Sequence, residues 1–149
     1  MRKLKAIIAG FAGAIALNVL HEAVKRLDSK APRVDLIGKE ALSKTLKGVG
    51  LTPPSGASLT EAALVGDIFS NTLYYSLIGS GKGNKNWIKG IMLGLSAGVG
   101  ALSLPKQMGL NDTPVTKNLR SETLTVAYYT IGGIVAAAAF AAMNKGDKG

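Results

Sequence analysis

The residues whose types suit chemistry are a few polar and ionisable side chains that lie within or at the ends of long apolar segments. They are Asn18, His21, Glu22, Asp67, Asn71 and Glu122. Ionisable groups in apolar segments are costly in lipid and usually face a bundle interior or water, so they mark a candidate functional site. Antiparallel helices would bring all six into the same half of a bilayer, where we expect them to converge. Asp67 is the central candidate, because a rise of about 1.5 Å per residue places it roughly 10 Å inside its segment.

Two interpretations of this predicted polar cluster stay open at the level of sequence. In the functional one, its ionisable members bind or transfer a proton or a cation, and its asparagines supply hydrogen bonds. In the structural one, Asp67 and His21 form a buried contact that fixes helix register, while the two glutamates pair with neighbouring basic residues. In both, Asp67 faces the bundle interior within hydrogen-bonding distance of another segment, most directly of His21 or Asn18.

Recognisable catalytic and metal-binding motifs are missing. His21 and Glu22 match the start of the HExxH zinc motif, but His21 is the only histidine in the chain. The Gly-rich stretch from Gly79 lacks the spacing and the preceding strand of a phosphate-binding loop. The absence of cysteine excludes disulfides, thiolate metal sites and cysteine nucleophiles. We therefore expect a non-catalytic protein without metal or cofactor, a carboxylate site for a hard cation being the remaining alternative.

Four apolar segments supply the helices that would position these side chains. The last runs from Thr123 to Asn144 without one charged residue, and a membrane-spanning helix needs about 20 such residues. We predict spans at about residues 4–24, 59–78, 87–104 and 123–143. Pro105 should end the third span, and the capping-box pattern of Ser58 and Glu61 should open the second. The first three spans are weaker because polar or charged residues interrupt or flank them.

The long connection between the first two spans contains a further helix. Over about residues 33–49, apolar side chains recur at helical spacing, while most of the charged ones lie off that face. We predict an amphipathic helix that lies either on the membrane surface or as a cap on the end of the bundle. Arg26, Arg33 and Lys39 are candidates for contact with lipid headgroups. The Gly- and Lys-rich connection 79–86 is predicted to be a flexible turn.

These elements define the expected fold class. It is all-α, a single domain 1–149 that forms an integral membrane bundle of four transmembrane helices, with the amphipathic helix between the first two; a soluble helical bundle is the alternative. Glycines at Gly90, Gly94 and Gly98 follow one face of the third span, and we expect them to serve close packing within the bundle. Residues 1–24 are expected to remain in the mature chain and not to be cleaved as a signal peptide.

The composition indicates a membrane partner. Eighteen Lys and Arg against nine Asp and Glu give a net charge of +9, which suits nucleic acid or an anionic membrane surface. Nucleic acid is not the expected partner, because the chain lacks basic stripes interleaved with aromatic residues. The expected partners are the lipid bilayer, anionic lipids, and another membrane protein or a second copy of the chain. The stretch from His21 to Gly38 resembles small bacterial membrane proteins, which implies a bacterial inner membrane. Orientation stays open, because basic residues are divided almost evenly between the two sides.

The function expected from these features is that of a small polytopic, non-catalytic membrane protein that acts as a packing or assembly subunit of a membrane complex. One alternative is a small transporter or channel that uses the polar cluster around Asp67. The other is a membrane enzyme that acts on lipid headgroups. A cavity that reaches Asp67 would favour transport, and a groove open sideways to lipid would favour lipid chemistry. A dry cluster beside an exposed face of small residues would favour assembly.

Overall fold

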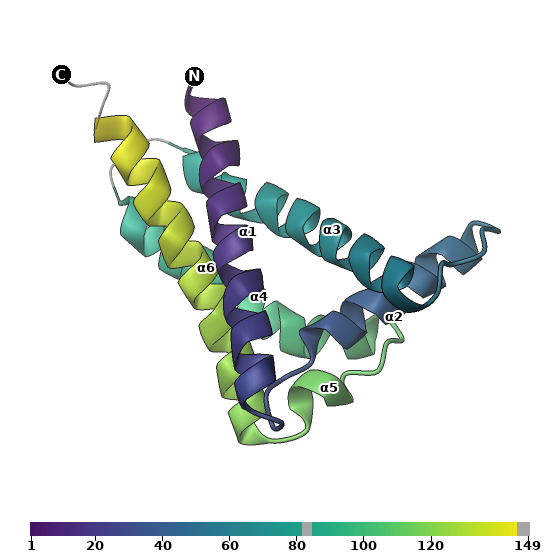
Figure 1. The fold of residues 1–149 in the computed structure, drawn as a ribbon. Coiled ribbons are helices and arrows are strands. Elements are labelled where there is room, and N and C mark those ends of the chain that lie inside the picture. The colour runs from purple at the N-terminus through teal and green to yellow at the C-terminus, as the bar shows by residue number, and fades with distance from the viewer. Residues whose placement is uncertain (82–84, 146–149) are drawn as a thin grey trace.

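The structure, a computed structural model, describes residues 1–81 and 85–145, and most of these residues lie in helices (Figure 1). The elements are α1 (Arg2–Leu27), α2 (Val34–Gly48), α3 (Gly56–Tyr75), a 3-10 turn η1 (Ser76–Gly79), α4 (Asn86–Gln107), the short α5 (Thr113–Thr116) and α6 (Leu119–Lys145). The described residues contain no strand, which confirms the predicted all-α class. Within the connection predicted to be a flexible turn, residues 82–84 lie outside the described residues.

Three of these helices, α1, α4 and α6, are long and apolar enough to cross a membrane. The 22 residues of α4 cover roughly 33 Å, which matches a hydrocarbon core about 30 Å thick. These three helices correspond to the first, third and fourth predicted spans. The second predicted span forms α3, which is not among the three because Glu61, Asp67 and several Ser, Thr and Asn side chains lower its hydropathy. The fold is therefore all-helical, and three of its helices could span a membrane by their length and composition.

Glycines bring α6 close to both α1 and α4. A Cβ atom built on Gly94 of α4 would lie 2.5 Å from Cα of Thr130, and one built on Gly13 of α1 would lie 2.5 Å from the carbonyl oxygen of Gly132. No larger residue fits at such distances without moving a helix. The predicted packing role of the glycine face of α4 is thus confirmed, and van der Waals contact at small residues holds the three helices together.

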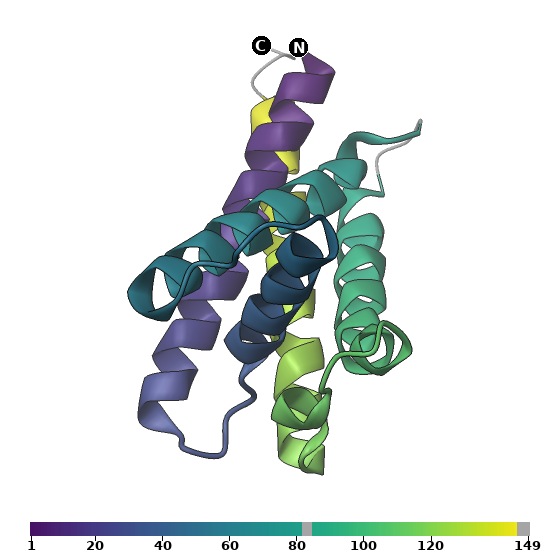
Figure 2. The ribbon, with the colours of Figure 1, turned by 90° about the vertical axis from the view of Figure 1, so that its right-hand side faces the viewer.

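Helices α2 and α3 form an arm that projects from this bundle (Figures 1 and 2). The arm meets α1 near the C-terminal end of α3, where a Cβ atom on Gly10 would collide with the carbonyl oxygen of Thr72. From there α3 diverges from α1 toward its own N-terminus (Figure 1). α2 forms within a residue of its predicted bounds, has no buried residue, and packs along α3 and against α5.

The connection between α1 and α2 is held against α5 and the residues that follow it, at the end of the bundle that we call its foot. The backbone N–H of Arg33 donates to the carbonyl oxygen of Pro114 at 2.9 Å, and Nζ of Lys117 donates to that of Ala31 at 3.0 Å. Ala31 itself is almost fully buried. These contacts join residues far apart in the sequence, and they set the direction in which α2 leaves the bundle.

Two predicted helix boundaries are wrong. Pro105 lies inside α4, which continues to Gln107. A proline removes one hydrogen bond to the preceding turn, a loss that a helix tolerates in its last turn more easily than in its centre. α3 begins at Gly56, so Ser58 lies inside the helix and the predicted capping box does not form.

Candidate functional site

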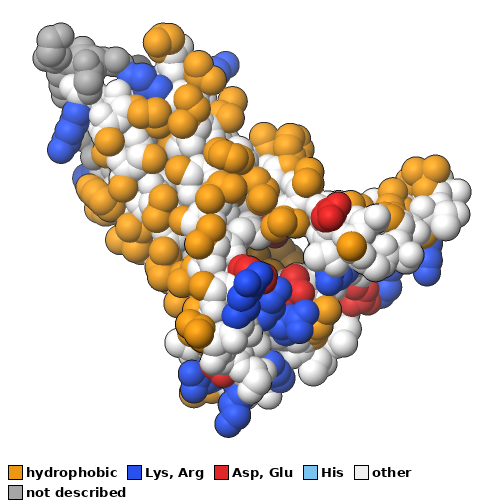
Figure 3. Space-filling model, viewed as in Figure 1, with side chains coloured by type: hydrophobic (Ala, Val, Ile, Leu, Met, Phe, Trp, Pro, Cys, Tyr) orange, Lys and Arg blue, Asp and Glu red, His pale blue; other side chains and the backbone are white. Residues whose placement is uncertain are grey.

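A cavity of about 630 Å³ lies between α1, α2 and α3. Figure 3 shows it as a hollow between the bundle and the arm, with acidic and basic side chains gathered beside the opening. Its wall is mostly apolar and comes from four helices: Ile15, Leu17, Val19 and Ala23 of α1, Val34 of α2, Ala63, Leu64 and Ile68 of α3, and Tyr128 and Tyr129 of α6. A concave, mainly apolar space of this size with a few polar groups is typical of a ligand site.

Three residues form an inner polar group where α1 approaches α3. Nδ2 of Asn18 donates to Oδ2 of Asp67 at 2.8 Å, and Nδ2 of Asn71 donates to Oδ1 at 3.0 Å. Asp67 and Asn71 are four residues apart and so lie on the same face of α3, while Asn18 reaches them from α1. Both carboxylate oxygens therefore have an amide donor. The predicted contact between Asp67 and Asn18 is confirmed, and the partner of Asp67 across the helices is Asn18, not His21.

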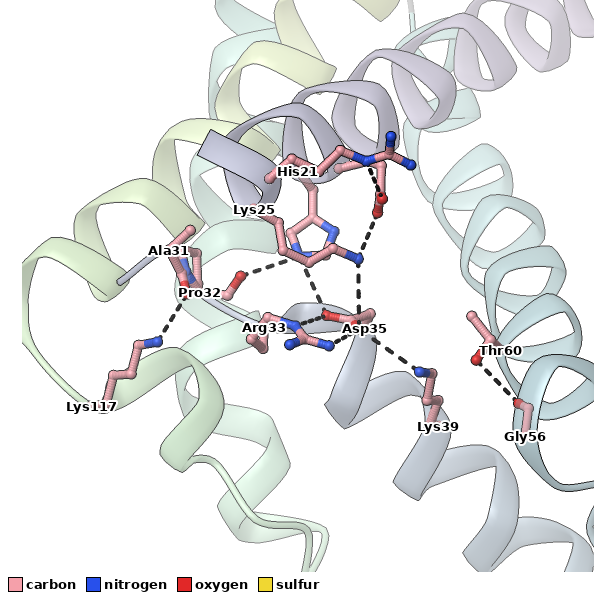
Figure 4. Close-up of polar contacts among 12 residues, drawn as sticks. His21, Lys25, Ala31, Pro32, Arg33, Asp35, Lys39, Gly56, Thr60 and Lys117 are labelled. Carbon is pink, nitrogen blue, oxygen red and sulfur yellow. Dashed lines mark hydrogen bonds and ion pairs between the residues drawn. The ribbon is translucent and has the colours of Figure 1, made fainter. Parts of the chain in front are cut away.

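His21 contacts the segment that leads into α2. Its Nε2 lies 3.2 Å from the carbonyl oxygen of Pro32 and 3.6 Å from Oδ1 of Asp35 (Figure 4). Its ring meets the ring of Tyr128 edge-on. The carbonyl can only accept a hydrogen bond, so Nε2 carries the proton in this arrangement. His21 is buried. Through its contacts with Pro32 and Asp35 it links the C-terminal part of α1 to the start of α2.

Asp35 stands at the centre of the charges beside the cavity. Arg33 donates to both of its carboxylate oxygens, from Nε at 2.8 Å and from an Nη at 2.7 Å, while Nζ of Lys25 and Nζ of Lys39 each lie 3.9 Å from Oδ2 (Figure 4). Burial alone would raise the pKa of Asp35, but the hydrogen bonds and charge of Arg33 and the charge of Lys25 bring this pKa below its ordinary value. Asp35 is therefore a carboxylate held among cations.

Glu22 forms the second acidic point beside the cavity. Lys25 lies 2.6 Å from one of its carboxylate oxygens, and Nε of Arg26 donates to the other at 2.9 Å. These pairs follow from helical spacing, because residues three and four apart meet on the surface of α1. We call Glu22, Lys25, Arg26, Arg33, Asp35 and Lys39 the charged rim.

The structure divides the predicted polar cluster into two sets and excludes one member. Asn18, Asp67 and Asn71 form the inner polar group, while His21 and Glu22 belong to the rim side of the cavity. Glu122 does not join either set, and its predicted convergence with them is wrong. It follows Ser121, which is fully buried, so the helical turn of about 100° per residue directs Glu122 away from the face of α6 that packs inward.

The predicted headgroup candidates Arg26, Arg33 and Lys39 all lie in the charged rim, although only Arg26 and Lys39 line the cavity itself. Sequence reasoning missed Asp35, Lys25 and the two tyrosines as site residues. The sequence did contain a signal for Asp35 and Lys25, because each has an oppositely charged residue close to it in the chain. Asp35 lies two residues after Arg33, and Lys25 lies three residues after Glu22. No such signal existed for Tyr128 and Tyr129, which lie in an uninterrupted apolar run.

In residues 1–81 and 85–145, His, Asp and Glu do not gather in groups of three or more that could hold a metal ion. The charged rim lies at one edge of the mostly apolar cavity. An amphiphilic molecule, which has one polar and one apolar end, would fit this arrangement. Comparisons with protein-family models, with curated proteins and with solved structures gave no match to this chain.

Proposed function

We propose that this chain is a small, non-catalytic integral membrane protein that binds an amphiphilic molecule between its helical bundle and its arm. The observation that carries the proposal is the cavity of about 630 Å³, whose wall is mostly apolar and whose charged residues, apart from Asp67, gather at one edge. The apolar part of the ligand would contact the side chains of α1 and α3, and its polar end would contact the charged rim.

The outer surface of the bundle supports a membrane location. Large apolar side chains are exposed along α1 and α4, among them Ile7, Phe11, Ile88, Leu95 and Val99. In water such a surface would be unfavourable, whereas in a bilayer it contacts lipid tails. The more specific location in a bacterial inner membrane rests on the sequence resemblance alone.

The direction of the helices supports α3 as a fourth membrane-crossing helix. The N-terminus of α1 lies beside the turn that precedes α4, since Arg2 donates to the carbonyl oxygens of Gly79 and Gly81. α1 and α4 therefore run in the same direction, and the chain must return across the membrane between them. α3 is the helix that makes this return (Figure 1), and its exposed Val65, Phe69 and Leu73 would face lipid.

Filling the cavity tests the proposal. Gly38 of α2 lines the cavity, and a Cβ atom there would meet nothing within 4 Å, so Gly38→Phe should project a ring into the space without strain. Gly48→Phe is the matched control, because Gly48 lies on the same helix in equally open surroundings but does not line the cavity.

The measurement is native mass spectrometry of protein reconstituted in defined phospholipids and released from detergent. Wild type and Gly48→Phe should retain bound lipid, and Gly38→Phe should lose most of it. Equal retention by all three proteins would contradict the proposed binding site.

A second function, assembly with another membrane helix, is favoured by a different observation. Ala62, Gly66 and Ser70 follow one another at four-residue spacing along α3, and all are exposed. Such a stripe allows close helix contact in lipid. Gly66→Phe should then reduce cross-linking between copies, or to a partner that co-purifies, and unchanged cross-linking would contradict this role.

A further inference from the structure

We propose that the charged rim binds the phosphate group of an anionic phospholipid, with Lys25, Arg26 and Lys39 as its donors. This inference rests on the proposed function and names its ligand class. In a bilayer the lipid tail gains little by moving from other tails into an apolar cavity, because both surroundings are apolar. Selectivity must therefore come from the polar end of the ligand, and hence from the rim.

The charge of the rim favours an anion. It holds four cations, Lys25, Arg26, Arg33 and Lys39, against two carboxylates, Glu22 and Asp35. Two positive charges are thus left uncompensated at the edge of a low-dielectric cavity, where charge interactions are stronger than in water. A phosphate group supplies the missing negative charge and several acceptor oxygens.

The geometry leaves donors available for that group. The two carboxylate oxygens of Asp35 receive their hydrogen bonds from Arg33, at 2.8 and 2.7 Å. Nζ of Lys39 lies 3.9 Å from Asp35, beyond hydrogen-bond distance, and lines the cavity. Arg26 donates to Glu22 through Nε, and its side chain is 76% exposed, so the guanidinium remains accessible to a ligand.

The acidic residues hold the lysines in position before any ligand binds. Nζ of Lys25 lies 2.6 Å from Glu22 and 3.9 Å from Asp35, which places this ammonium between the two carboxylates at the edge of the cavity. Preorganised cations lose less conformational freedom on binding than free lysine side chains do. Asp35 and Glu22 are therefore positioning residues, not competitors that close the site.

The position along α1 fits a lipid with its head at the rim and its tail in the cavity. The uncharged stretch of α1 ends at His21, so Lys25 and Arg26 lie where the headgroups begin. Asn18 of the inner polar group is seven residues before Lys25, or about 10 Å deeper along the helix. The carboxyl group of Asp67 at that depth disfavours a phosphate, which leaves the rim as its place.

The test compares phospholipids with identical tails. Protein in equimolar phosphatidylglycerol and phosphatidylcholine is released for native mass spectrometry, and the ratio of the two bound lipids is recorded. Wild type should prefer phosphatidylglycerol. Because a lysine near anionic lipid contributes about 1 kcal/mol, the Lys25→Gln, Lys39→Gln double variant should lower this preference by about thirtyfold while total bound lipid persists.

Two control variants separate local from general charge effects. Lys47→Gln, Lys106→Gln removes the same charge outside the cavity and should leave the preference unchanged. Lys25→Arg, Lys39→Arg keeps the charge and should retain the preference. If the double glutamine variant does not fold, Lys39→Gln alone should lower the preference by about fivefold, since Lys39 makes no direct hydrogen bond to Asp35.

The contrary outcomes are distinguishable. Wild type that binds both lipids equally, with binding still lost in Gly38→Phe, would overturn the phosphate site and leave the proposed function standing. Wild type that binds no lipid would overturn both. Displacement of phosphatidylglycerol by an equal concentration of inorganic phosphate would overturn the lipid as the source and indicate a site for free phosphate.

Discussion

The hydrogen bond between Asn18 and Asp67 joins α1 to α3, and its removal should loosen the arm. Asn18 donates from Nδ2 to Asp67 at 2.8 Å and to the carbonyl oxygen of Ala14 at 3.0 Å. Hydrogen bonds to charged groups contribute about 1.5–3 kcal/mol, whereas side-chain bonds between membrane helices average about 0.6 kcal/mol. For a part-buried contact to a carboxyl group beside a cavity, we expect a coupling energy of about 1 kcal/mol.

A double-mutant cycle of Asn18→Ala and Asp67→Ala measures this energy, with the free energy of unfolding followed by circular dichroism in mixed micelles. Asn144→Ala is the control, because Nδ2 of Asn144 donates to the carbonyl oxygen of Phe140 four residues earlier, at 2.8 Å, just as Asn18 does to Ala14. Its coupling to Asp67→Ala should be close to zero. A coupling of Asn18 to Asp67 below about 0.3 kcal/mol would refute the reasoning, because it would show that the bond does not hold the arm.

Three further predictions concern packing, pH and membrane integration. Gly94→Leu should destabilise the bundle by more than about 2 kcal/mol, because its Cβ would lie 2.5 Å from Cα of Thr130. Gly66→Leu is the control and should not destabilise it, because a Cβ at Gly66 meets nothing within 4 Å. The free energy of unfolding of each variant tests both statements. Because the pKa of Asp35 is lowered in the folded protein, ionised Asp35 stabilises the fold fully above its ordinary pKa, and this stabilisation is lost as the pH falls through the lowered pKa. Wild type should therefore lose more thermal stability than Asp35→Asn between about pH 5 and about pH 2. Equal losses in the two proteins would contradict this. Carbonate-washed membranes should retain the protein, and its release into the wash would contradict integration.

Local features of the sequence were enough to predict most helices and one site contact. The uncharged run from Thr123 to Asn144 and the helical spacing over residues 33–49 correspond to α6 and α2, since both signals arise within a single element. The hydrogen bond of Asp67 could be predicted because an unpaired carboxyl group in an apolar segment costs free energy, and a hydrogen-bond donor reduces that cost.

Only the tertiary structure decided how these elements enclose a site. The angle of α3 to α1 is set by Gly10 and Thr72 at one end, and the direction of α2 by the contacts of Ala31 and Arg33 with the foot of the bundle. These contacts join residues far apart in the chain, and no periodicity within one helix specifies them. For the same reason the sequence grouped Glu122 with Asp67, whereas the rotation of α6 about its axis separates them. The sequence by itself therefore determined the helices and the polar residues they carry, and the helix angles determined that some of those residues share a cavity.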